Sequence, residues 1–358
     1  MFTEINNLEQ MTPQQLDAYL NRGWFRMGQM IFTCRFLNFG NDLYTAVWIR
    51  LDLKEYKFRK SLRKILKKNG ERFRIVVRRA VFNMEKEMLY HEHKSRFEGY
   101  VAGTLKESLH VESGNIYDTW EICVYDGYRL VAVSFFDNGS DSLASIMGLF
   151  DPAYTKYSLG FYTMLLEISI GLENNKKYYY PGYVVPGYQR FDYKLRIGET
   201  DYYLPETNEW RPYSEMIFEE LPSEILNRKL KEIQTVLTDA GIDNRKILYP
   251  LYDKEMYGYE KLDFVKYPYF ISCYHQKEKI SLLIIEYDLH EEKYRISQVN
   301  KFEDTLSYLA YLLFEGHDEE NSYLEFLCRE KVLLESTNMD DIVEKVKTHA
   351  DWTIKRNV

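Results

Sequence analysis

The chain has 358 residues, which is long enough for two or three domains with sizeable cores. Its 32 tyrosines and 20 phenylalanines exclude an intrinsically disordered protein, and it contains no apolar run long enough for a transmembrane helix. The net charge of −8 divides into +2 over residues 1–213 and −10 over the remainder, so the total charge does not exclude a nucleic-acid partner.

The first predicted region covers residues 1–80. Thr12 and Pro13 are typical of a helix start, and they predict a helix over 12–21. An aromatic stretch broken by glycines, 23–40, and an alternating stretch, 45–53, predict strands. A basic amphipathic helix is expected over 56–70 with Gly70 near its C-cap, and another strand over 72–82.

The second predicted region covers residues 81–213. A polar helix begins it at 83–105, and strands follow at 120–126, 128–136 and 142–150, the first two joined by a turn at Asp126 and Gly127. An apolar helix over 158–172 then leads to a tyrosine-rich strand over 178–185. Meander strands followed by one helix and a parallel strand are typical of the GNAT acyltransferase core.

The third predicted region, 214–358, is acidic, which suggests an accessory or protein-contact role. A helix over 224–241 is followed by three strands, at 268–276, 279–289 and 293–302, that could form an antiparallel meander. Two helices are expected to end the chain.

The segment from Arg50 to Arg79 contains thirteen Lys or Arg residues and only three acidic ones. Cations that surround a narrow apolar stripe on one helix favour contact with a polyanion, because each neutralised phosphate releases counterions. A solvated amphipathic face is the structural alternative, and a membrane-surface helix is disfavoured by the thin apolar stripe. The expected RNA-binding residues are Lys57, Arg59, Lys60, Arg63, Lys64, Lys67 and Lys68.

Residues 157–212 read YSLGFYTMLLEI, then YYYPGYVVPGYQRFDYK, and end on LPETNEWRP. Their order resembles the C-terminal half of aminoacyl-tRNA–protein transferases. SLRKILKKN, at 61–69, and NRGWFRMG, at 21–28, resemble N-terminal elements of that family, with Trp24 and Arg26 at matching positions. The resemblance implies an α+β fold: tandem GNAT-like acyltransferase domains, with 1–80 and 81–213 as the two halves and 214–358 as an additional α+β domain.

The resemblance also assigns the expected site residues. Glu167 is a candidate base or substrate orienter, since a carboxylate on an apolar helix must be paired or have a raised pKa. Asp137 and Tyr180 complete the expected catalytic set. Gly160 lies at a helix start that can bind an anion, where a lone glycine suits a tRNA acceptor end better than coenzyme A. The remaining substrate-binding candidates are Tyr178, Tyr183, Arg190 and Lys194, together with Trp24 and Arg26.

The family's closely spaced cysteines are missing: Cys34, Cys123, Cys273 and Cys328 lie far apart. Such spacing builds neither a metal site nor a disulfide scaffold, so we expect no cofactor and a cytoplasmic setting.

The function that the resemblance implies is transfer of an amino acid from aminoacyl-tRNA to a protein N-terminus bearing Asp or Glu. The PET-x-x-W ending favours arginine over leucine as the donor. The expected partners are tRNA and an acceptor protein or peptide, with no membrane and no DNA. Two alternatives stay open: a non-catalytic RNA- or protein-binding module on a degenerate transferase fold, and a coenzyme A-dependent N-acyltransferase.

Overall fold

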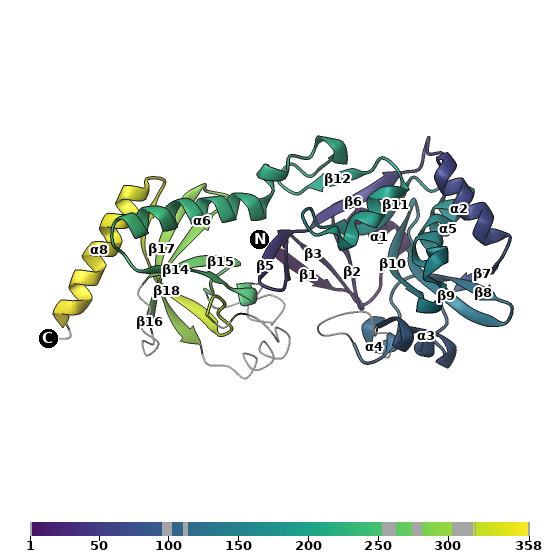
Figure 1. Ribbon diagram of the computed structural model, residues 1–358, viewed down its shortest axis with the longest axis horizontal. Helices are drawn as coiled ribbons and strands as arrows, with labels where there is room; N and C mark the ends of the chain where they lie inside the picture. The colour runs from purple at the N-terminus through teal and green to yellow at the C-terminus, as the bar shows by residue number, and fades with distance from the viewer. Residues whose placement is uncertain are drawn as a thin grey trace. The chain divides into compact units, whose positions relative to one another are not determined.

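The computed structural model describes residues 2–94, 102–109, 114–252, 263–273, 281–302, 318 and 320–356. These residues form a mixed α+β protein (Figure 1), as the sequence predicts. Among them, no helix is long and apolar enough to span a bilayer. The expected tandem arrangement of two GNAT-like domains is not confirmed.

The chain divides into two compact units rather than three consecutive regions. One unit comprises 1–4, 34–45 and 217–358, and the other comprises 5–33 and 46–216. The predicted boundary at residue 80 falls inside one sheet, because β6 (Val47–Asp52), β7 (Arg74–Arg79) and β8 (Thr119–Asp126) are strands of the same sheet. The boundary near residue 214 lies close to the observed one.

The larger unit is built on an eight-stranded sheet, whose order is β13-β12-β6-β11-β10-β9-β8-β7. Only β10 and β11 pair in parallel, and the helix α5 connects them. The other strands of this sheet are β9 (Arg129–Asn138), β10 (Ser142–Phe150), β11 (Tyr178–Val184), β12 (Asp201–Leu204) and β13 (Glu209–Pro212). Strands β1 (Thr3–Asn7), β3 (Met30–Cys34) and β2 (Phe25–Met27) form a separate small sheet.

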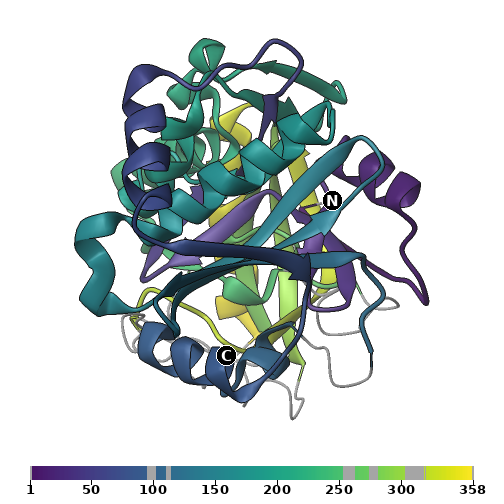
Figure 2. The ribbon, with the colours of Figure 1, turned by 90° about the vertical axis from the view of Figure 1, so that its right-hand side faces the viewer.

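Helices cover both faces of the eight-stranded sheet (Figure 2). α5 (Leu159–Glu173) packs on one face and carries α2 (Lys60–Gly70), while α3 (Met84–Lys94) and α4 (Leu105–Leu109) pack on the other. α1 (Pro13–Leu20) begins at the predicted N-cap with a complete capping box. The connections include the 3₁₀ helices η1 (Pro152–Tyr157), η2 (Gln189–Ile197) and η3 (Tyr213–Glu215).

The smaller unit is an antiparallel sheet in the order β14-β15-β16-β17-β18, with α6 and α8 packed against it. Its elements are β4 (Phe36–Phe39), β5 (Asp42–Thr45), η4 (Phe218–Glu220), α6 (Pro222–Asp239), β14 (Asn244–Leu248), η5 (Pro250–Tyr252), β15 (Tyr269–Cys273), β16 (Ser281–Asp288), β17 (Lys293–Phe302), β18 (Phe326–Ser336) and α8 (Met339–Arg356).

Two details of this unit differ from the sequence-based expectation. The β4-β5 hairpin belongs here because Phe36 and Leu43 are buried in the core formed with α6. α8 is one of the two helices expected at the end of the chain, and the strand β18 that precedes it was not expected. Residues 303–317 lie outside the described part of the chain.

Candidate active site

A cavity of about 580 Å³ opens where β10 and β11 stop pairing. The two parallel strands pair only over Ser142–Ala144 and Tyr178–Tyr180. The next residue of β11 is Pro181, which has no N–H to donate, and β10 has an irregularity between Ser145 and Met147. The lining residues are His93, Ser134, Ser145, Ile146, Met147, Gly148, Phe150, Thr155, Ser158, Gly160, Phe161, Thr163, Met164, Glu167, Pro181, Arg190, Phe191, Tyr193 and Lys194.

Four of the residues predicted from the sequence meet in this cavity. They are Gly160, Glu167, Arg190 and Lys194. The other predicted substrate and catalytic residues are not among its lining residues: Trp24, Arg26, Asp137, Tyr178, Tyr180 and Tyr183. The cavity is therefore lined by the predicted residues of α5 and η2, whereas the other predicted substrate and catalytic residues lie outside its lining.

Glu167 lies on α5 and is completely buried against the sheet. Its Oε2 accepts a hydrogen bond from the Tyr179 hydroxyl at 2.7 Å. Burial raises the pKa of Glu167 to about 7, although the hydroxyls of Tyr179, Ser134 and Ser145 act to lower it. A carboxyl group that titrates near neutrality in a cavity is a strong candidate for a general base.

This raised pKa predicts a stability difference that depends on pH. The pKa of Glu167 is about 7 in the folded chain against 4.5 for an ordinary glutamate, so ionisation destabilises the fold as pH rises through that interval. Glu167→Gln should therefore raise the free energy of unfolding by about 3 kcal/mol at pH 8 and by under about 1 kcal/mol at pH 5. Urea denaturation at both pH values measures the difference. Equal effects at the two pH values would contradict the assignment.

Lys194, on η2, is half-buried and also lines the cavity. Its ammonium donates to the carbonyl of Tyr183 at 2.8 Å and lies 5.0 Å and 5.4 Å from the ring centroids of Tyr183 and Phe191. Burial lowers the pKa of Lys194 to about 7. Gly182, with a φ of +90°, permits this approach, because a Cβ there would lie 3.3 Å from Nζ. The lysine can thus change its charge when a ligand enters.

Gly160 is the second residue of α5, at the helix end that faces the cavity. The first backbone bond of the helix runs from the Tyr162 amide to the Ser158 carbonyl, so the amides before it are available to a ligand. Ser158 has a left-handed backbone, and its side chain makes no capping hydrogen bond. A Cβ on Gly160 would meet the Phe150 ring at 3.2 Å.

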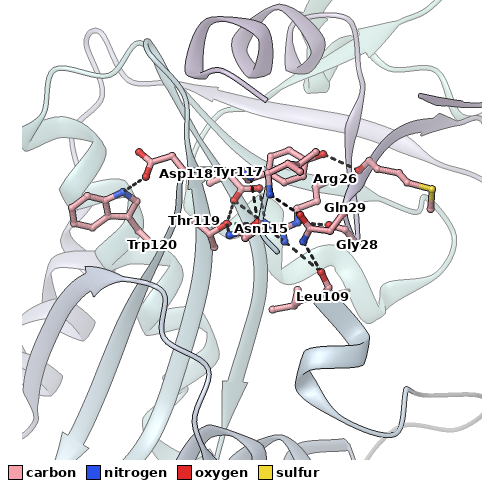
Figure 3. A network of polar contacts seen from close by, with 12 residues as sticks. Arg26, Gly28, Gln29, Leu109, Asn115, Tyr117, Asp118, Thr119 and Trp120 are labelled. Atoms are coloured by element: carbon pink, nitrogen blue, oxygen red, sulfur yellow. Dashed lines mark hydrogen bonds and ion pairs between the residues drawn. The ribbon is translucent and has the colours of Figure 1, made fainter. Parts of the chain in front are cut away.

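Arg26 and Thr119 belong to a network of polar contacts (Figure 3), and the buried Asp137, which is not a lining residue of the cavity, is bonded to both of them. Its carboxylate accepts hydrogen bonds from Arg26 at 3.0 Å and from the Thr119 hydroxyl at 2.6 Å. Arg26 also lies 4.5 Å from the ring centroid of Tyr117 and contacts the side chain of Asn115. Fully paired groups of this kind hold β2 to β8 and β9, so the contacts of Arg26 and Asp137 favour a structural role.

The tyrosines of β11 divide between the two faces of the sheet. Tyr179 and Tyr180 are both buried, since helices or aromatic residues cover each face. Tyr180 packs near Trp210, with 5.7 Å between ring centroids. Tyr178 contacts the Arg50 guanidinium, 4.3 Å from its ring centroid, and Tyr183 contacts Trp48. Trp24 packs against Tyr19. A substrate-binding role for Tyr178, Tyr183 and Trp24 remains a prediction.

The seven predicted RNA-binding cations are all exposed on α2 and the segment before it. α2 packs on α5 through Leu62, Ile65 and Leu66, which leaves its charged face toward solvent. Among the described residues, the only ion pair made by these cations is the long contact between Lys67 and Glu71, at 3.9 Å. The helix that carries Glu167 therefore also supports a largely unneutralised basic surface.

Sequence reasoning missed Tyr179 and Ser134. The sequence analysis selected Tyr178, Tyr180 and Tyr183, because the strand register that turns Tyr179 toward α5 is not visible in the sequence. Ser134 is the single hydroxyl within the apolar run VAVSFF, and a polar residue inside a buried strand was the available signal. In the described part of the chain, no cluster of His, Cys, Asp and Glu could hold a metal ion.

Comparison with known proteins gives a consistent set of relatives. Residues 77–203 match the family model described as arginine-tRNA-protein transferase, C terminus. An aspartate/glutamate leucyltransferase of Leptospira interrogans is 26% identical over 210 residues, covering 57% of this chain and 79% of that protein. The aspartate/glutamate leucyltransferase of Campylobacter jejuni strain RM1221 is 28% identical over 200 residues, covering 53% and 80%.

Solved structures share lower similarity. The structure of L-PGS from Bacillus licheniformis has a TM-score of 0.32 and 13% identity, covering 47% of this chain and 49% of that one. FemX has a TM-score of 0.33 and 10% identity, covering 49% and 61%.

Proposed function

Because the chain is a member of the aminoacyl-tRNA–protein transferase family, we propose that it transfers leucine from leucyl-tRNA to protein N-termini that bear Asp or Glu. The observation that carries the proposal is the cavity that unites Glu167, Lys194, Arg190 and the start of α5. Leucine is chosen because the relatives are named leucyltransferases, and the arginine preference expected from the PET-x-x-W ending is not supported.

The reaction needs one proton transfer and one acyl transfer. The acceptor α-ammonium, whose ordinary pKa is about 8, first releases one proton to solvent. The neutral amine nitrogen then attacks the ester carbonyl and gives its own surplus proton to the Glu167 carboxylate as the new C–N bond forms, and the C–O bond to the tRNA ribose breaks. The departing ribose oxygen takes the proton from Glu167, which returns the site to its starting state. The aminoacyl ester is already activated, so positioning and this proton transfer suffice.

Different groups suit the two substrates. The basic face of α2 contacts the tRNA backbone, and the amides at the start of α5, which lines the cavity, stabilise a carbonyl or phosphate oxygen. The ammonium of Lys194 and the guanidinium of Arg190 suit the side-chain carboxylate of an N-terminal Asp or Glu.

Lys194 should set the preference for acidic acceptors. Lys194→Met is expected to lower the ratio of kcat/KM for an Asp-starting peptide to that for an Asn-starting peptide by about 10- to 100-fold. Because burial lowers the pKa of Lys194 to about 7, its charge is present below that pH and lost above it, and the wild-type ratio should fall from pH 6 to pH 8.

The matched control is Lys176→Met, since Lys176 also donates to backbone carbonyls, of Gly139 and Ser140, but does not line the cavity. If Lys194→Met left the ratio of kcat/KM for the two peptides unchanged, Lys194 would have no role in acceptor recognition.

The proposed function is tested by offering leucyl-tRNA and arginyl-tRNA in parallel, each with peptides that start with Asp, Glu or Ala. Leucine should appear on the Asp and Glu peptides only. Transfer of arginine alone would reverse the donor assignment. Salt-sensitive tRNA binding with no transfer from either donor would favour the non-catalytic module, and a thermal shift with coenzyme A esters alone would favour the N-acyltransferase.

A further inference from the structure

The carboxylate of Glu167 has unequal surroundings at its two oxygens. Oε2 accepts the hydrogen bond from Tyr179, whereas Oε1 is buried and has no hydrogen-bond partner among the described residues. A buried acceptor without a donor costs free energy, so native structures rarely retain one without a reason. Since Glu167 lines the cavity, a ligand can supply the missing donor.

Ser134, which lines the same cavity, has a second buried polar atom without an ordinary hydrogen bond. It lies on β9, opposite Gly148 of β10, and only 2% of the residue is exposed. Its Oγ is buried and, like Glu167 Oε1, makes no hydrogen bond of ordinary geometry in the described part of the chain, although it lies close enough to Glu167 to lower the pKa of that carboxyl group. Strand neighbours Val133 and Phe135 are fully buried apolar residues, so the hydroxyl is a local exception on this strand.

Glu167 Oε1 and Ser134 Oγ together limit which chemical groups could bind between them. A carboxylate oxygen only accepts, and a hydroxyl can accept as well as donate. An anion would be repelled by the ionised carboxylate, and a hydroxyl ligand has only one proton to give. A primary amine or ammonium has enough N–H groups for both acceptors, and its positive charge compensates the buried carboxylate.

We infer that Glu167 Oε1 and Ser134 Oγ form the subsite for the acceptor's α-amino group, and that Tyr179 is the positioning residue that holds Oε2. The inference rests on the proposed function and deepens it. One N–H of the ammonium is donated to Ser134 and another to Oε1, and the third proton is released to solvent, which frees the nitrogen lone pair. As that lone pair forms the bond to the ester carbonyl, the proton that faces Oε1 moves to this oxygen, and it then leaves with the ribose oxygen.

The pH response of this subsite depends on all groups around Glu167. Tyr179 faces it from β11, Tyr193 from η2, and the hydroxyls of Ser134 and Ser145 from the sheet. The charged or titratable groups elsewhere in the cavity are His93, Arg190 and Lys194. Among these, Tyr179 donates directly to the carboxylate and therefore favours its ionised form.

The variants separate positioning from packing. Tyr179→Phe keeps the ring but loses the donor, so the pKa of Glu167 should rise and the acid limb of the pH–rate profile should move to higher pH. Tyr162→Phe, which alters another buried tyrosine of the same unit, outside the cavity lining, should leave that limb in place.

Ser134→Ala should raise the KM of the acceptor peptide about tenfold with the KM of leucyl-tRNA unchanged. Ser169→Ala, on the same helix as Glu167, is its control.

The deciding experiment titrates Glu167 by carbon-13 NMR of labelled glutamate carboxyl groups in the full chain. The probes are an Asp-Ala amide peptide and its N-acetylated form, which lacks the ammonium. The free-amine peptide should lower the pKa of Glu167, the acetylated peptide should not, and Ser134→Ala should weaken binding of only the free-amine peptide. If the free-amine peptide does not lower the pKa of Glu167, the proposed subsite is wrong, even if leucine transfer is observed. A lowered pKa without transfer to any peptide would support the subsite and reject the proposed function.

Discussion

Replacing Glu167 by glutamine should lower kcat for leucine transfer by about 10²- to 10⁴-fold, the range that a general base contributes. Glutamine matches the shape of glutamate and can still accept the hydrogen bond from Tyr179, but it cannot take the amine proton. The variant is also expected to be more stable than the wild type at pH 8, so a loss of rate cannot be assigned to unfolding. Single-turnover kinetics with preformed leucyl-tRNA and an Asp-starting peptide measure the effect.

The matched control for this prediction is Glu173→Gln. Glu173 ends the same helix but is exposed and is not a lining residue of the cavity. Its replacement should leave kcat within about twofold of the wild type, as surface substitutions usually have small effects. Equal activity in Glu167→Gln and Glu173→Gln would exclude Glu167 as the base.

Charge reversal on α2 should abolish productive tRNA binding. Changing Lys60, Arg63, Lys64 and Lys67 to Glu removes four cations from an exposed face and adds four anions, so affinity should fall by at least about 100-fold at low salt. The slope of log affinity against log salt should become shallower by about 3, because each phosphate contact contributes roughly 0.7 to 0.9. Fluorescence anisotropy of labelled tRNA over a salt series measures both quantities.

A control with the same change in charge uses the smaller unit. Lys231, Lys266, Lys331 and Lys347 are exposed there, and their reversal to Glu should leave tRNA affinity near the wild-type value. If the control weakened binding as much as the α2 variant, net charge would explain the effect, and α2 would not be a specific contact surface.

The sequence predicted the local elements that carry the site. The apolar helix with one carboxylate, the tyrosine strand and the basic helix all form close to their expected positions, because each has a clear periodicity or terminus signal. Glu167, Gly160 and Lys194 were selected on a resemblance in residue order, and they line one cavity. The basic helix was also correctly expected to leave its cations exposed.

Features that depend on non-local pairing escaped the sequence analysis. β6 pairs with β11 across more than a hundred residues, so no local pattern indicates that the first eighty residues share a sheet with the site. The β4-β5 hairpin joins the smaller unit only through packing of Phe36 and Leu43. Tyr179 and Ser134 gain their importance from the register of β11 and β9, which brings both to the α5 face of the sheet.

The most direct test of the central claim is mass spectrometry of an Asp-starting peptide after incubation with the full chain and leucyl-tRNA. The account predicts one added leucine on the α-amine, formed faster as pH rises from 6 to 7 and lost in Glu167→Gln. An unmodified peptide, under conditions in which the protein binds leucyl-tRNA and remains folded, would contradict it.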